Sequence, residues 1–61
     1  MKKFTIDRRH NHIAISYTIL VDEFDDIYDW CYNKPEAYEC YATGIVYKTE
    51  PDLTMFLLRW A

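Results

Sequence analysis

Apolar and polar residues alternate along the first third of the chain. Phe4 and Ile6 share one face of residues 2–7 (KKFTID), and residues 12–21 (HIAISYTILV) alternate more clearly. The apolar positions of this second segment are Ile13, Ile15, Tyr17, Ile19 and Val21. Both segments are rich in β-branched or aromatic residues, so they predict two strands. The polar residues 8–11 (RRHN) form the loop of the resulting hairpin, with Asn11 able to adopt positive φ.

Over residues 21–33 (VDEFDDIYDWCYN) the apolar spacing changes to that of one helical face. The positions that follow the i, i+3, i+4, i+7 pattern are Phe24, Ile27, Tyr28 and Cys31. Asp22 is the expected N-cap, with Asp25 as a shorter form of the capping-box acid. Pro35 disfavours helix in the residue before it, so the helix is expected to end near Asn33.

Residues 34–38 (KPEAY) predict a turn, and residues 39–48 (ECYATGIVYK) predict a third strand. Gly44 inside this strand indicates a bulge or a close backbone approach.

Helical spacing returns in the last segment, residues 49–61 (TEPDLTMFLLRWA). Thr49 and Asp52 resemble a capping box, and Pro51 lies in the first turn, where proline is tolerated. The apolar positions are Leu53, Phe56, Leu57 and Trp60. A strand over residues 53–60 is the alternative, but the capping residues favour a short helix.

Together these elements predict a single α+β domain over residues 1–61, in the order β-β-α-β-α. We expect a three-stranded, mainly antiparallel sheet with both helices packed on one face. The 61 residues are 51 % hydrophobic and 18 % aromatic, which is enough apolar material for a compact core. A core of this size cannot hide so many aromatic rings, so some should remain exposed and favour association with a partner or a second copy.

Charge is segregated along the chain. Residues 1–13 hold four basic residues against Asp7, a balance of +3, and residues 22–40 hold seven acids against Lys34, a balance of −6. The remainder is neutral, which gives the net charge of −3.

The acids concentrate on the predicted central helix, opposite its apolar stripe. They are Asp22, Asp25, Asp26 and Asp29, with Glu23 nearer the edge, and Trp30 and Tyr32 flank the stripe on its two sides. One interpretation is a solvated face with half-buried aromatic residues at its rim. The other is an acidic surface with aromatic anchors that binds a protein partner through all seven residues.

The sequence offers little support for metal binding or for catalysis. His10, His12, Cys31 and Cys40 are residue types that bind zinc, but their spacing favours surface histidines and buried cysteines. A disulfide between Cys31 and Cys40 is possible in geometry but is not expected in a reducing cell. Ser16 has no evident base, the aspartates share one solvated face, and one glycine cannot make a phosphate loop. We expect a protein that is not an enzyme and needs no cofactor or metal.

Nucleic-acid binding is a weaker alternative, based on Lys2, Lys3, Arg8 and Arg9 with the two histidines at one end of the hairpin. The pI of about 5.1 is well below that expected for a DNA or RNA binder. The opposite role is mimicry of nucleic acid. The predicted helix carries one carboxylate per about 2.4 Å of its length, and duplex DNA carries one phosphate charge per about 1.7 Å. The low net charge disfavours it.

The chain begins with charge but no apolar run that would make a signal peptide, and no stretch is long enough for a membrane span. These features predict a cytoplasmic location.

Two motifs carry a resemblance to a known group of proteins. The run DDIYDWC (Asp25–Cys31) and the C-terminal DLTMFLLRW (Asp52–Trp60) resemble segments of small accessory proteins of tailed bacteriophages, of T4-like and cyanophage types. The resemblance implies a phage accessory protein in the cytoplasm of a bacterial host and brings no known functional residues.

The leading hypothesis is therefore a non-enzymatic accessory protein that binds, and so modulates or inhibits, a host protein. The alternatives are a structural homo-oligomer or minor virion component and a small nucleic-acid-binding protein that uses the basic hairpin. The three hypotheses differ in which surface of the protein would contact the partner.

Overall fold

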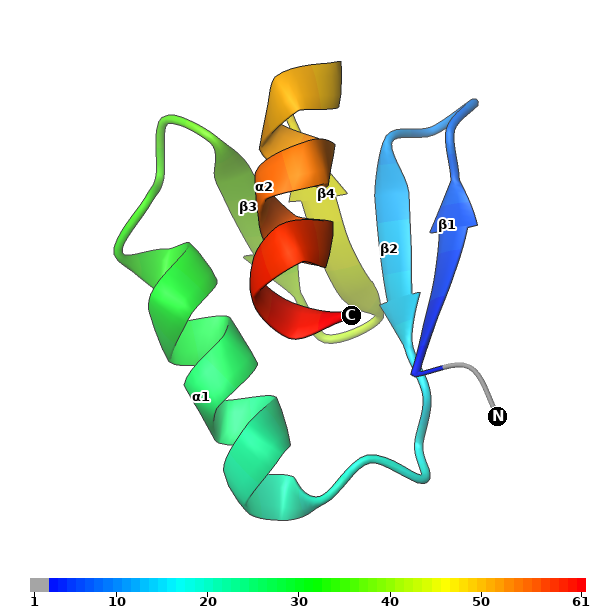
Figure 1. Ribbon diagram of the computed structural model, residues 1–61, viewed down its shortest axis with the longest axis vertical. Helices are drawn as coiled ribbons and strands as arrows, with labels where there is room; N and C mark the ends of the chain where they lie inside the picture. Colours follow the sequence, from blue (N-terminus) through cyan, green and yellow to red (C-terminus); the bar gives the residue numbers. More distant parts are fainter. Residues whose placement is uncertain (1–2) are drawn as a thin grey trace.

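The computed structural model describes residues 3–61 and has an α+β fold (Figure 1). In chain order the elements are β1 (Phe4–Asp7), β2 (His12–Ile15), α1 (Val21–Tyr32), β3 (Tyr38–Tyr41), β4 (Gly44–Tyr47) and α2 (Glu50–Trp60). The four strands form one antiparallel sheet in the order β1-β2-β4-β3. The α+β class is confirmed, while the expected three-stranded sheet and β-β-α-β-α order are wrong by one strand.

The extra strand comes from residues 39–48, which form a hairpin instead of one strand. Ala42 and Thr43 make a tight turn between β3 and β4. Cys40 pairs with Ile45, so both side chains lie on the same face of the sheet. Five positions separate these residues, and a single continuous strand would send them to opposite faces. The turn is thus what lets both residues reach the core.

Gly44 begins β4 at a close backbone approach, as predicted. Its φ is +145°, and a Cβ atom there would lie 2.5 Å from the carbonyl oxygen of Ile13 and 2.7 Å from Nε2 of His12. Only glycine fits this combination of backbone conformation and contact.

β2 is shorter than expected and ends at Ile15. Ser16 redirects the chain: its hydroxyl accepts a hydrogen bond from the Thr18 N–H at 3.2 Å, and its carbonyl accepts one from Ile19 N–H at 3.2 Å. Such local bonds compete with a strand ladder. Tyr17, predicted to face the core, is therefore 98 % exposed.

α1 matches the predicted helix, and its apolar stripe faces the core with Ile27 and Cys31 buried. The predicted cap is wrong. Leu20 occupies the N-cap position without a side-chain hydrogen bond, which places Asp22 inside the first turn. There an acid still interacts favourably with the positive end of the helix dipole. Asn33 ends the helix, and its side-chain amide donates to the Asp29 carbonyl at 2.8 Å.

α2 confirms the helical prediction for the last segment. Thr49 and Asp52 form the capping box, with the Thr49 N–H donating to Asp52 Oδ2 at 3.0 Å. Leu53 and Phe56 are the buried residues of this helix.

The core lies between the helices and one face of the sheet. By register, the residues on this face include Phe4, Ile13, Tyr38, Ile45 and Tyr47, and all five are buried. The buried residues of α1 and α2 join the same cluster, so both helices cover this face. Figure 1 shows α2 in front of the sheet and α1 beside it near β3.

Candidate functional site

The solvent face of α1 carries four exposed aspartates, which we call the acidic ridge: Asp22, Asp25, Asp26 and Asp29. They project outward because the opposite side of the helix packs in the core. Within residues 3–61, none of the four carboxylates forms an ion pair. The ridge therefore presents to solvent four carboxylates that have no ion-pair partner in the described part of the chain.

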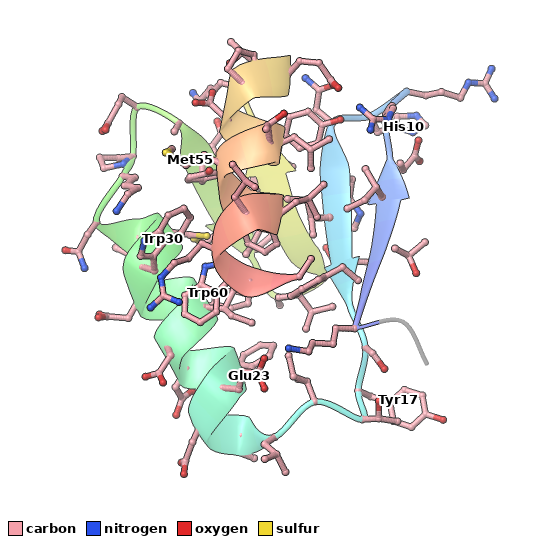
Figure 2. The ribbon with its side chains drawn as sticks, in the orientation of Figure 1. His10, Tyr17, Glu23, Trp30, Met55 and Trp60 are labelled. Atoms are coloured by element: carbon pink, nitrogen blue, oxygen red, sulfur yellow. The ribbon has the colours of Figure 1, made fainter. Side chains whose placement is uncertain are left out.

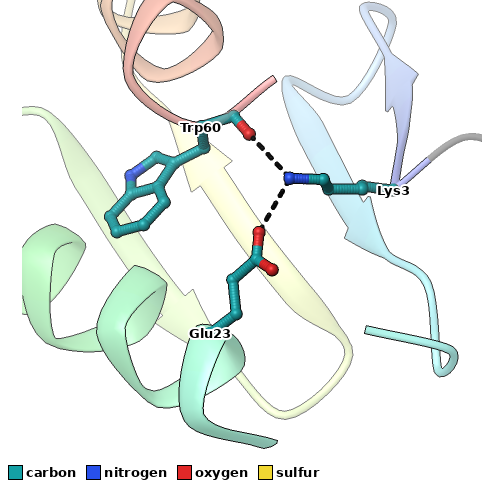
Figure 3. A network of polar contacts seen from close by, with 3 residues as sticks. All are labelled: Lys3, Glu23 and Trp60. Atoms are coloured by element: carbon teal, nitrogen blue, oxygen red, sulfur yellow. Dashed lines mark hydrogen bonds and ion pairs between the residues drawn. The ribbon is translucent and has the colours of Figure 1, made fainter. Parts of the chain in front are cut away.

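Glu23 is separate from this ridge. Its carboxylate oxygen Oε1 accepts a hydrogen bond from Lys3 Nζ at 2.8 Å, and the same ammonium lies 3.4 Å from the Trp60 carbonyl oxygen (Figure 3). Glu23 is thus engaged within the chain and contributes to holding α1 against α2 and the start of β1.

One flank of the ridge opens into a groove between α1 and α2. The lining residues are Asp26, Asp29, Trp30, Asn33, Lys34, Arg59 and Trp60. The Trp30 and Trp60 rings meet edge to face with centroids 6.0 Å apart, as their positions in Figure 2 illustrate. Trp30 also contacts Tyr38 and Phe56, so this predicted anchor is partly a core residue.

Two cations cover the tryptophan rings in this groove. Lys34 Nζ lies 4.3 Å from the centroid of Trp30, and Arg59 Cζ lies 4.3 Å from that of Trp60. These are cation–π distances. Neither cation forms an ion pair within the described part of the chain, although both line the same groove as Asp26 and Asp29. The groove thus places positive and negative groups beside two half-buried rings.

The other flank of the ridge carries a second groove, between the end of α1 and β3. Its lining residues are Tyr32, Pro35, Tyr38, Glu39, Cys40 and Tyr41. Tyr32 is 76 % exposed, whereas the Tyr28 hydroxyl donates to the Tyr41 carbonyl at 2.5 Å and ties α1 to this strand. The predicted placement of Trp30 and Tyr32 on two sides of the helix stripe thus corresponds to two different grooves.

The predicted basic group is not brought together. Lys3 precedes β1, whereas Arg8 and Arg9 lie in the turn at the other end of that strand, and Lys2 lies outside the described residues. Arg8 pairs with Glu50 at the start of α2. The positive charge at the turn is thereby partly neutralised within the chain.

The histidines and cysteines are likewise dispersed among different elements. His10 Nδ1 lies 2.8 Å from Asp7 Oδ2 in the exposed turn, and this hydrogen bond lowers the pKa of Asp7. Cys31 and Cys40 are free thiols on α1 and β3, and burial raises the pKa of Cys31 to about 12. Across residues 3–61, no three His, Cys, Asp or Glu side chains are grouped so that they could hold a metal ion.

Some surface residues were missed by the sequence patterns. Tyr17, Leu20 and Val21 are strongly exposed just before and at the start of α1, whereas the alternation pattern predicts Tyr17 and Val21 on the core face of a strand. The Ser16-x-Thr18 pair is the local signal that could have shortened that strand. Arg59 and Trp60 were not linked to the acidic helix, because only the packing of α2 places them there.

Comparison of the chain with protein-family models, curated proteins and solved structures returns no match. Among the described residues, none of the helices has the length and apolar character needed to span a membrane.

Proposed function

We propose that this protein acts without catalysis by binding another protein through the acidic ridge of α1 and the two grooves beside it. The observation that carries the proposal is the set of four exposed aspartates, none of which forms an ion pair within residues 3–61. In a chain that pairs Lys3, Arg8 and Lys48 with other acids, these four carboxylates stay open.

The chemistry of the surface supports a partner segment that is basic and carries aromatic or aliphatic side chains. Opposite charge steers such a segment to the ridge and increases its association rate. The exposed Tyr32 ring and the Trp30–Trp60 groove offer contact area for apolar groups, and tyrosine and tryptophan often dominate binding energy at interfaces. A modulator or inhibitor of a host protein, as the resemblance to phage accessory proteins implies, fits this surface.

Charge-neutral variants of the ridge test the proposal without disturbing the core. The variant Asp25→Asn/Asp26→Asn/Asp29→Asn removes three exposed carboxylates from α1. The matched control, Asp7→Asn/Glu36→Gln/Glu50→Gln, removes the same formal charge from exposed positions outside the ridge and its two grooves. Trp30→Ala is a poorer probe, because Trp30 packs against Phe56 and Tyr38.

The measurement is quantitative mass spectrometry of proteins that co-purify with each variant from bacterial lysate, followed by titration of the purified partner. We expect the ridge variant to lose the partner while the control retains it, with the wild-type affinity falling as salt increases. Equal recovery of the same partner by the wild type and the ridge variant would show that this surface is not the binding site.

A further inference from the structure

The two edges of the sheet differ in how they are covered. At one edge, β3 is tied to the segment that follows α1, because the Tyr38 N–H, which points away from β4, donates to the Lys34 carbonyl at 3.0 Å. The Tyr28 hydroxyl of α1 also donates to the Tyr41 carbonyl of this strand. At the other edge, β1 is the outermost strand, and Figure 1 shows no helix or strand of the described chain beyond it. An open edge presents unpaired backbone groups that can pair with another chain.

The hydrogen-bond pattern identifies which groups of β1 face outward. Ser16 N–H donates to the Lys3 carbonyl at 2.8 Å, which makes Lys3 and Ser16 a hydrogen-bonded pair of the β1–β2 hairpin. Hydrogen-bonded and non-hydrogen-bonded pairs alternate in an antiparallel ladder. Because Phe4 and Ile6 occupy the intervening, non-hydrogen-bonded positions, their N–H and C=O groups point away from β2, off the free edge.

We propose that β1 pairs with β1 of a second copy of this chain across a two-fold axis at Thr5, in antiparallel register. Phe4 then forms hydrogen-bonded pairs with Ile6 of the second copy, and Ile6 with its Phe4, so all the outward backbone groups of these two residues are satisfied. Thr5 lies opposite its own symmetry mate, and Lys3 lies opposite Asp7 of the other copy. The two four-stranded sheets become one continuous sheet.

Charge and side-chain pattern favour this register over its neighbours. The Thr5 register matches a cation with a carboxylate and an aromatic ring with a β-branched side chain, and both kinds of cross-strand pair are stabilising. A register centred on Ile6 would place Lys3 opposite Arg9 and Phe4 opposite Arg8. A register centred on Phe4 would align only Phe4 with a residue of the partner β1.

Four of the five side chains in this pairing reach solvent, whereas Phe4 is buried against Phe56. Lys3 and Asp7 are about half exposed, and on pairing they exchange their solvent-screened contacts with Glu23 and His10 for contacts with the second copy. Thr5 is exposed on the sheet face that no helix covers. Ile6 is partly buried in one copy, and the second copy covers it further. β1 lies at the opposite edge of the sheet from β3 and the groove of Tyr32, and it carries none of the ridge aspartates.

Complementary charges at Thr5 test the proposal by sedimentation velocity and light scattering from micromolar to millimolar concentration. We expect the wild type to form dimers with increasing concentration. Thr5→Lys alone and Thr5→Glu alone should each dimerise about fivefold or more weakly, because like charges face each other across the axis. An equimolar mixture of the two variants should recover a dimer.

Thr43→Lys and Thr43→Glu are the matched controls, since Thr43 is an exposed threonine in the other hairpin. They should dimerise as the wild type does. A wild type that stays monomeric at millimolar concentration overturns the proposal, and so does a dimer that persists equally in both single Thr5 variants. Circular dichroism establishes that each variant is folded.

A cross-link provides a second, geometric readout. Directly opposed residues of a non-hydrogen-bonded pair have Cα atoms about 4.5 Å apart, within the range that a disulfide spans. Thr5→Cys should therefore form a covalent dimer under mild oxidation, whereas Thr43→Cys should not. Equal cross-linking of both variants would contradict the register.

Discussion

The Lys3 ammonium lies 2.8 Å from the Glu23 carboxylate and so joins the start of β1 to the first turn of α1. The same ammonium approaches the carbonyl of Trp60 at the C-terminus of α2, where the helix dipole is negative. One cation therefore connects three elements. Patterns along the chain had assigned Lys3 and Glu23 to separate binding surfaces, whereas the fold uses each to hold the other.

A double-mutant cycle with Lys3→Met and Glu23→Gln should measure the coupling between these two side chains. Their side chains are 49 % and 32 % exposed, so solvent screens the pair and we expect about 0.2–1 kcal/mol of coupling free energy of unfolding. Urea denaturation at low and high salt is the measurement, and the coupling should decrease with salt. The longer Lys48–Glu39 pair, with 3.5 Å between the ammonium nitrogen and the carboxylate oxygen, is the control and should couple less. A coupling independent of salt would rule out a predominantly electrostatic contact.

Truncation of Trp30 should lower the free energy of unfolding far more than truncation of Tyr32, although the sequence predicts both residues as anchors for a partner. Trp30→Ala should lower the free energy of unfolding by about 2–4 kcal/mol, because its ring packs at 5.4 Å from Tyr38 and 6.0 Å from Trp60. Tyr32→Ala should change it by less than about 0.5 kcal/mol, since its side chain is mostly exposed. Chemical denaturation compares the two variants. Equal destabilisation would mean that Tyr32 packs more closely than its exposure indicates.

Gly44→Ala should be strongly destabilising, by about 2 kcal/mol or more, because φ is +145° and the new methyl group would meet the Ile13 carbonyl. Thermal unfolding of this variant against Thr43→Ala, at the adjacent exposed turn position, provides the comparison. Adding His12→Ala should not restore stability, since the closest atom belongs to the backbone. Full rescue by His12→Ala would assign the clash to the imidazole instead.

Alkaline pH should destabilise the protein. Burial raises the pKa of Cys31 from 9.0 to about 12 and that of Tyr38 from 10.0 to about 12. At a pH between the ordinary pKa of each group and its raised pKa in the folded chain, the unfolded chain loses a proton that the folded chain keeps. The free energy of unfolding therefore falls as pH increases from about 9 towards 12. The stabilising difference is fully present below pH 9.

Urea denaturation from pH 7.5 upward should show this decline, and Cys31→Ala should reduce its slope because one of the linked groups is gone. Cys31→Ala will also lower the overall stability by leaving a small cavity. Only the slope therefore tests the linkage. An unchanged slope would show that Cys31 does not titrate differently in the folded and unfolded states.

Several elements could be predicted because their signals are local. The helix stripe that ends at Cys31 and the capping box of Thr49 with Asp52 each depend on residues within two turns of one another, and both are present. The second hairpin was missed because Ala42 and Thr43 are not typical turn residues. The glycine that indicates the turn follows it, at Gly44.

The candidate site was predictable in part. Helical periodicity alone placed the aspartates on one face of α1 and put Trp30 and Tyr32 on its two sides. It could not show that Trp30 meets Trp60, because 30 positions separate these residues and only the docking of α2 joins them.

By itself, the sequence determined the faces of the two helices: apolar stripes that had to be buried and, on α1, an acidic face that had to remain in water. Periodicity suffices for this, because side-chain direction repeats with the local backbone geometry. The tertiary structure decided which charges are neutralised and where grooves form. Lys3 contacts Glu23, 20 positions away, and Trp60, 57 positions away, because β1, α1 and α2 converge there. Such pairings depend on how elements pack, which no periodicity within one element specifies.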